Sequence, residues 1–169
     1  MGCDCDGKLK GWVKPEDVVK ALNYLGFTDV KSYVSEPRKD WLLKEFHDKY
    51  PDEPWVMNPS YPKSEYHETI SGFIQFKAFD EDRQIHYFYT NECDFGSLYE
   101  LPENEGKDKK DFEPEEFTSI SFRVWGHSTE IMRSILQVLG GGYLDENDCD
   151  DTPAYIVIPK CDIRRMDVV

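Results

Sequence analysis

Five carboxylates crowd into seven residues near the end of the chain: Asp145, Glu146, Asp148, Asp150 and Asp151. Carboxylates packed this closely can hold a hard cation weakly. An EF-hand loop does not fit, because counting from Asp145 puts Asp150 where glycine is required and Ile156 where glutamate is required. Three interpretations remain open for 145–151: a solvated surface loop, a weak divalent-cation binder, and a recognition surface for a basic partner.

A second acidic stretch, 100–116, holds eight acidic residues and three lysines. The two stretches together supply −10 of the formal net charge of −14. Acidic patches steer basic proteins at long range and can imitate the phosphate track of DNA. We therefore expect the five carboxylates of 145–151 to bind a basic or nucleic-acid-binding protein.

Two of the four histidines form a repeated motif, in His67-Glu68-Thr69 and His127-Ser128-Thr129. The pair resembles the two-histidine phosphoesterases, small proteins of two pseudo-symmetric βα halves that contribute one such motif each. The resemblance implies that His67 and His127 act as general acid and base on the phosphodiester of a cyclic or linear nucleotide, while Thr69 and Thr129 hold phosphate oxygens. The competing interpretation makes His67 a loop residue and His127 the residue before a helix.

Both ends of the chain resemble a family of small uncharacterised phage and prophage proteins. The likeness rests on the opening Met-Gly-Cys-Asp and the late Gly-Gly-Tyr-Leu-Asp-Glu-Asn-Asp-Cys-Asp-Asp. It implies no activity, but it implies a product that acts inside a bacterial cell, and many such products are acidic inhibitors. Our leading hypothesis is therefore an acidic, non-enzymatic inhibitor of a host defence or nucleic-acid-binding protein, with the phosphodiesterase as the alternative.

The composition excludes several classes of protein. The 169 residues, 39% hydrophobic and 14% aromatic, are typical of one folded domain spanning 1–169 rather than a disordered chain. The net charge repels phosphate backbones and anionic lipids, and no apolar run approaches the ~20 residues of a membrane span. We expect no direct nucleic-acid binding, no membrane binding and, without a glycine-rich phosphate loop, no cofactor.

The cysteines indicate a reducing compartment. Their number, five, is odd, and Met1–Asp6 has neither the basic nor the apolar stretch of a secretory signal. We expect the cytoplasm, that of the host if the protein is phage-encoded. Cys3 and Cys5 form one close pair with no second pair to complete a zinc site, so we expect no metal there.

Apolar periodicity predicts the elements that position these residues. Alternation predicts strands at 8–13, 29–34, 72–78, 84–90, 119–125 and 155–158, and helical spacing predicts helices at 15–25 and 128–139. We expect an α+β fold with a mostly antiparallel sheet of about six strands and two main helices packed on one face. The expected order is β-α-β, hairpin, β-α-β.

The remaining segments are expected to be turns and loops. Prolines predict an irregular loop at 50–68, preceded by a short helix around 41–46. A charged loop is expected at 100–116, and the hairpin between 72–78 and 84–90 is expected to turn over Asp80-Glu81-Asp82.

Overall fold

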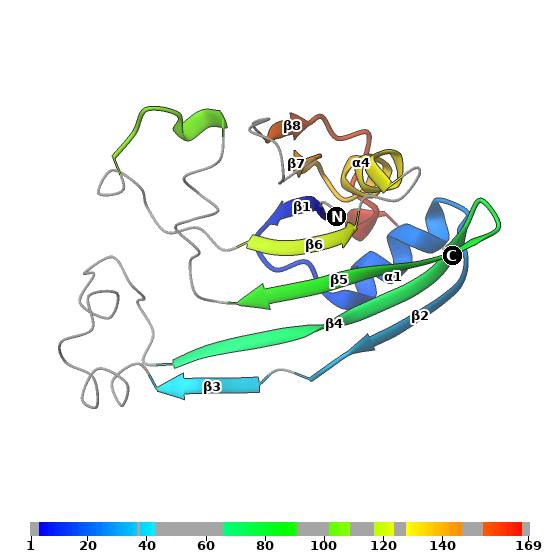
Figure 1. Ribbon diagram of the computed structural model, residues 1–169, viewed down its shortest axis with the longest axis horizontal. Coiled ribbons are helices and arrows are strands. Elements are labelled where there is room, and N and C mark those ends of the chain that lie inside the picture. The colour runs from blue at the N-terminus through cyan, green and yellow to red at the C-terminus, as the bar shows by residue number, and fades with distance from the viewer. Residues whose placement is uncertain are drawn as a thin grey trace.

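The computed structural model describes residues 4–36, 38–42, 66–90, 102–108, 117–123, 128–146 and 154–166 (Figure 1). The elements in chain order are β1 (Asp4–Lys10), α1 (Pro15–Tyr24), β2 (Thr28–Val34), β3 (Arg38–Leu42), β4 (Tyr66–Ala78), β5 (Glu81–Thr90), η1 (Pro102–Asn104), β6 (Phe117–Arg123), α4 (Ser128–Val138), β7 (Gly142–Asp145), β8 (Tyr155–Val157) and η3 (Ile163–Arg165). Both predicted helices are confirmed, and each ends within one residue of its predicted boundary.

One antiparallel sheet contains all eight strands. Their order is β2-β4-β5-β6-β1-β7-β8. β3 lies off this path and pairs with the first residues of β4, Tyr66 to Thr69. The predicted α+β class and the order β-α-β, hairpin, β-α-β are confirmed, with β1-α1-β2 and β6-α4-β7 on either side of the β4–β5 hairpin. The sheet joins distant parts of the chain, because β1 lies between β6 and β7.

Two short strands were not expected. β3 occupies Arg38–Leu42, where a helix around 41–46 was predicted, and residues 43–46 lie outside the described part. β3 is a strand because it pairs with the start of β4, which begins at Tyr66 and so corrects the end of the loop predicted at 50–68. β7 has only four residues, too few to show alternation. Both segments are therefore strands because of their pairing with distant strands rather than because of their own sequence pattern.

The β4–β5 hairpin turns more tightly than expected. Ala78 pairs with Glu81, which leaves a two-residue turn of Phe79 and Asp80. Both residues have positive φ angles, 55° and 59°, as a type I′ turn requires. The turn was predicted over Asp80-Glu81-Asp82. Glu81 and Asp82 instead belong to β5, and only Asp80 lies in the turn.

The core lies against one face of the sheet. Alternate residues of β1, β4, β5 and β6 are buried in a cluster that also contains the buried residues of α1 and α4, and Val30 and Val34 of β2 are partly buried against it. On β5 the inward residues are Arg83, Ile85, Tyr87 and Tyr89. The strand next to α4 carries Gly7 at the closest approach, where an added Cβ would lie 2.5 Å from the Met132 sulfur. Gly7 therefore lets the helix pack directly on β1.

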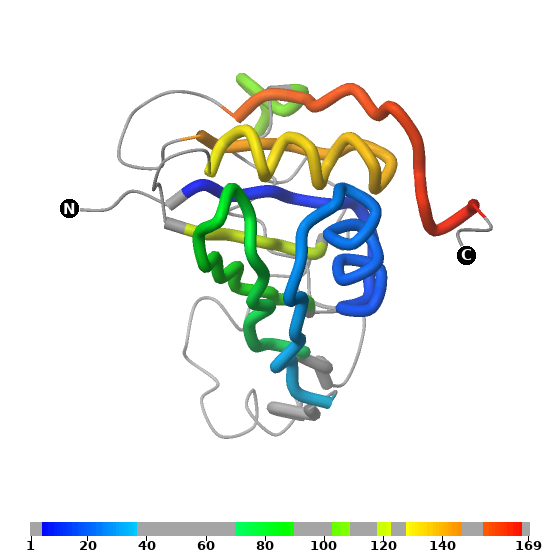
Figure 2. Tube along the Cα trace, turned by 90° about the vertical axis from the view of Figure 1, so that its right-hand side faces the viewer, coloured from blue at the N-terminus to red at the C-terminus, as the bar shows by residue number. Residues whose placement is uncertain are grey.

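The three consecutive glycines return the chain from α4 to the sheet. Gly140 and Gly141 have positive φ angles of 85°, and the Gly141 amide donates to the Leu136 carbonyl at 2.8 Å, so they end the helix. A Cβ on Gly142 would overlap the Lys8 carbonyl oxygen. β7 can therefore run beside β1 directly beneath α4, the arrangement visible in Figure 2.

Candidate functional site

The acidic stretch 145–151 begins where β7 ends. Asp145 is the last residue of β7 and lies opposite Asp6 of β1. Because Leu144 pairs with Tyr155 of β8, the chain between these strands closes a hairpin at this end of the sheet. Asp148, Asp150 and Asp151 lie outside the described residues. The structure therefore locates the base of the predicted partner-binding stretch rather than all of it.

Glu146 holds this base to the rest of the fold. The Tyr155 hydroxyl donates to Glu146 Oε1 at 2.5 Å, and Arg133 of α4 donates to the same oxygen at 3.1 Å. Arg133 also donates to the Tyr155 hydroxyl oxygen at 2.8 Å. Burial and the neighbouring Glu146 raise the pKa of Tyr155, so the phenol stays protonated and keeps donating. Of the two predicted binding residues described here, Glu146 thus has a structural role.

The acids near the loop base also act on a buried thiol. Cys5 is fully buried, and its pKa rises to about 11, chiefly through desolvation, with contributions from Asp6, Glu146 and Asp145. The Thr129 hydroxyl hydrogen-bonds the Cys5 sulfur and opposes this shift. The thiol therefore remains neutral and unreactive near neutral pH.

A third group of acids reaches the same end of the sheet. Strand register runs from Asp145 to Asp6, to Ser121 and to His86, and β5 continues from His86 back to the turn. We call this region the acidic end: Asp6, Asp80, Glu81, Asp82, Asp145 and Glu146. Arg83 forms an ion pair with Glu81 at 2.6 Å, and Lys77 lies opposite Asp82 in the strand register.

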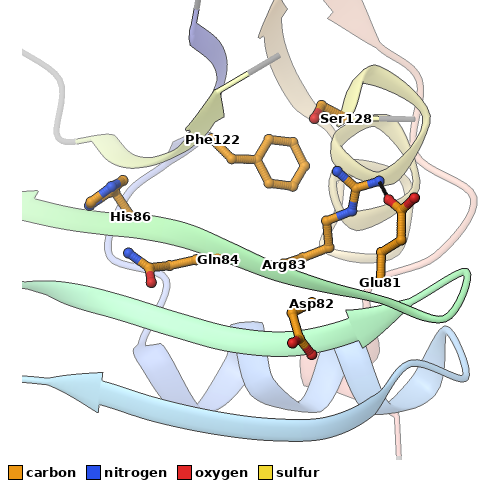
Figure 3. A pocket seen from close by; sticks show the side chains of 7 residues that line it. All are labelled: Glu81, Asp82, Arg83, Gln84, His86, Phe122 and Ser128. Carbon is orange, nitrogen blue, oxygen red and sulfur yellow. Dashed lines mark hydrogen bonds and ion pairs between the residues drawn. The ribbon is translucent and has the colours of Figure 1, made fainter. Parts of the chain in front are cut away.

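A hollow of about 730 Å³ opens at the acidic end (Figure 3). Its described lining is Glu81, Asp82, Arg83, Gln84, His86, Phe122 and Ser128. The side chain of Arg83 is only 7% exposed, and its guanidinium lies among Phe122, Ser128 and Glu81. His86 is the one imidazole in this described lining, so the hollow offers no acid–base pair of histidines there. Sequence analysis missed Arg83, although alternation along β5 places it in the inward register.

The histidine motifs are only partly described. His67 and Thr69 belong to β4, and Thr129 lies in the first turn of α4. The side chains of His67 and Thr69, and all of His127, lie outside the described part of the chain. The Thr129 hydroxyl is engaged by Cys5. The described residues therefore do not assemble the predicted phosphodiesterase site, which stays a prediction.

The two acidic stretches are attached at opposite ends of the sheet. Within 100–116 the structure describes 102–108, which contains η1. Glu103 lies 3.9 Å from the Lys10 ammonium, at the end of β1 far from Asp6. The described parts of the two stretches, 102–108 and 145–146, therefore lie toward opposite ends of β1.

Comparison with models of protein families, with curated proteins and with solved structures gives no match to this chain. Among the described residues, no group of three histidine, cysteine or acidic side chains is arranged to hold a metal ion. The same part of the chain contains no helix that is long and apolar enough to cross a membrane.

Proposed function

We propose that this chain is a non-enzymatic binding protein that engages a basic or nucleic-acid-binding protein through 145–151 and the acidic end. The resemblance of its termini to phage proteins extends the proposal to a host defence protein as the partner. Binding would block the partner's own nucleic-acid site, since clustered carboxylates present negative charge as a phosphate backbone does. The chain itself needs no cofactor for this role.

The pairing of Asp6 with Asp145 carries this proposal. The register places these two carboxylates directly opposite each other on β1 and β7, an arrangement of like charges that weakens cross-strand pairing. It lies at the base of a stretch that adds three further carboxylates, Asp148, Asp150 and Asp151. Such a concentration of negative charge favours the binding of a partner of opposite charge.

The overall charge distribution supports the same conclusion. The two acidic stretches, 100–116 and 145–151, together carry −10 of the formal net charge of −14. The excess negative charge is therefore concentrated in 24 of the 169 residues. Such segments raise association rates with a basic protein, and salt screens the effect within about 8 Å.

The test neutralises the acidic stretch but keeps Glu146, which holds the base of the stretch to the rest of the fold. Replacing Asp145, Asp148, Asp150 and Asp151 with Asn keeps Glu146 bound to Arg133 and Tyr155. A control carries the same number of neutralised acids in the other acidic stretch: Asp111→Asn, Glu113→Gln, Glu115→Gln and Glu116→Gln. The partner is isolated from bacterial lysate on wild-type protein and identified. Its association kinetics are then measured with purified proteins at two salt concentrations.

We expect association with the 145–151 variant to be about tenfold slower than with wild type at low salt, and the difference to shrink as salt rises. The control should associate within about twofold of wild type. Equal rates for all three proteins, unchanged by salt, would show that 145–151 is only a solvated loop.

A further inference from the structure

One row of side chains crosses the open face, which is the face of the sheet opposite the core. In strand order the row is Tyr33, Phe73, His86, Ser121, Asp6 and Asp145. Each residue is directly paired with the next across neighbouring strands. The row therefore links β2, near one edge of the sheet, to the base of 145–151.

One end of this row is aromatic, with Tyr33 exposed and Phe73 partly buried. The centroids of the Tyr33 and Phe73 rings lie 5.1 Å apart, and Tyr33 is 51% exposed. Phe88, which follows His86 on the same face of β5, is 45% exposed. Aromatic residues are enriched at the centres of protein interfaces, from which charged residues are depleted. This end has the composition of an interface core.

The other end of the row is acidic. Asp6 and Asp145 lie at its last two positions, and Asp82 is on the open face of β5, four residues before His86. The same surface thus passes from aromatic rings, through an imidazole and a hydroxyl, to carboxylates. That gradient is complementary to a segment with apolar residues at one end and basic residues at the other.

We propose that this row is the docking surface for a basic, amphipathic helix of the partner protein. The proposal rests on the proposed function and specifies where its partner binds. Six adjacent strands span five spacings of about 4.8 Å, roughly 24 Å in all, which matches about sixteen residues of helix. Apolar or arginine side chains would stack on Tyr33 and Phe73, and basic side chains would pair with Asp6 and Asp145.

The experiment uses two synthetic helical peptides of sixteen residues as probes. The basic peptide carries leucine and tryptophan in one half and arginine in the other, and the acidic peptide has glutamate in place of every arginine. Single-stranded DNA of twelve nucleotides is the third probe, because exposed rings can also stack on bases. Dissociation constants are measured by calorimetry for wild type and for three variants of the full chain.

Two variants alter the row, and one is a matched control. The double substitution Tyr33→Ser with Phe73→Ser removes the aromatic end, and Asp6→Asn with Asp145→Asn removes the charge. Tyr24→Ser removes a tyrosine of similar exposure, 46%, from helix α1. We expect wild type to bind the basic peptide alone. Each row variant should bind it about tenfold more weakly, while the control stays within about twofold.

Several results would overturn the docking surface. These are equal binding by the row variants and wild type, no binding of the basic peptide up to about 1 mM, or a preference for DNA that depends on Tyr33 and Phe73. The kinetics with the lysate partner separate the two proposals. If the 145–151 variant associates slowly but both row variants bind that partner normally, the proposed function stands and the docking surface fails. If the row variants lose the peptide while neutralising 145–151 changes nothing, the docking surface stands without the acidic stretch.

Discussion

The side chains on the two faces of the β4–β5 hairpin differ in how much they contribute to the stability of the fold. Ile74 pairs with Ile85 on the inner face, and both side chains are fully buried in the core. One position earlier on β4, Phe73 faces outward beside His86. The inner pair has the composition that burial favours, whereas the partly buried Phe73 ring and the exposed His86 imidazole contribute less to folding. Residues that contribute little to the stability of the fold are therefore the better candidates for binding a partner.

The largest difference between the two faces is expected for Ile74→Ala, which should lower the free energy of unfolding far more than Phe73→Ala. It removes a fully buried side chain from the core, and such substitutions cost about 2–5 kcal/mol because a cavity remains. Urea unfolding measures the change in the free energy of unfolding, with Phe73→Ala as the comparator on the neighbouring position. A loss at Phe73 equal to that at Ile74 would mean that the open face is covered by the protein itself.

The inner face should also show a pH dependence at Cys5. Its folded pKa of about 11 lies above the ordinary value of 9.0, so the protonated thiol stabilises the fold below pH 9. The free energy of unfolding should therefore fall by about 1–3 kcal/mol between pH 9 and pH 11. The measurement compares wild type with Cys5→Ala in reducing buffer, so that the other titrating groups cancel. Parallel pH profiles for both proteins would contradict a buried neutral thiol.

The smallest effect is expected at Phe88 on the open face. Phe88→Ser removes a ring that is 45% exposed, and surface substitutions usually change stability by no more than about 0.5 kcal/mol. Thermal unfolding at fixed pH checks this expectation. A drop of several degrees in the unfolding temperature would show that the fold depends on Phe88. The open face would then contribute to stability as the inner face does.

The periodic elements of this fold were predictable from sequence. Ile74, Phe76 and Ala78 alternate on β4, and Val18 and Leu22 recur at helical spacing on α1, because each set must reach the same core. β3 and β7 were missed, since four or five residues show too little periodicity and their pairing partners are distant. The type I′ turn was missed because neither Phe79 nor Asp80 is glycine.

The candidate site was less predictable than the fold. The charge of 145–151 was evident, but the role of Glu146 depends on Arg133 and Tyr155, which come from two other elements. The row from Tyr33 to Asp145 also had no sequence signal, because it depends on the register of six strands rather than on spacing along one. Only the order of the strands brings these side chains into one line.

The position of β1 has a consequence for the order of folding during synthesis. β1 is made early, but the strands on its two sides, β6 and β7, are made more than a hundred residues later. Such non-local pairing slows folding, because a long loop must close before any contact stabilises it. The β4–β5 hairpin can form as soon as it leaves the ribosome, whereas β1 must wait with both backbone edges unpaired. A chain interrupted before residue 117 would expose that strand to other chains.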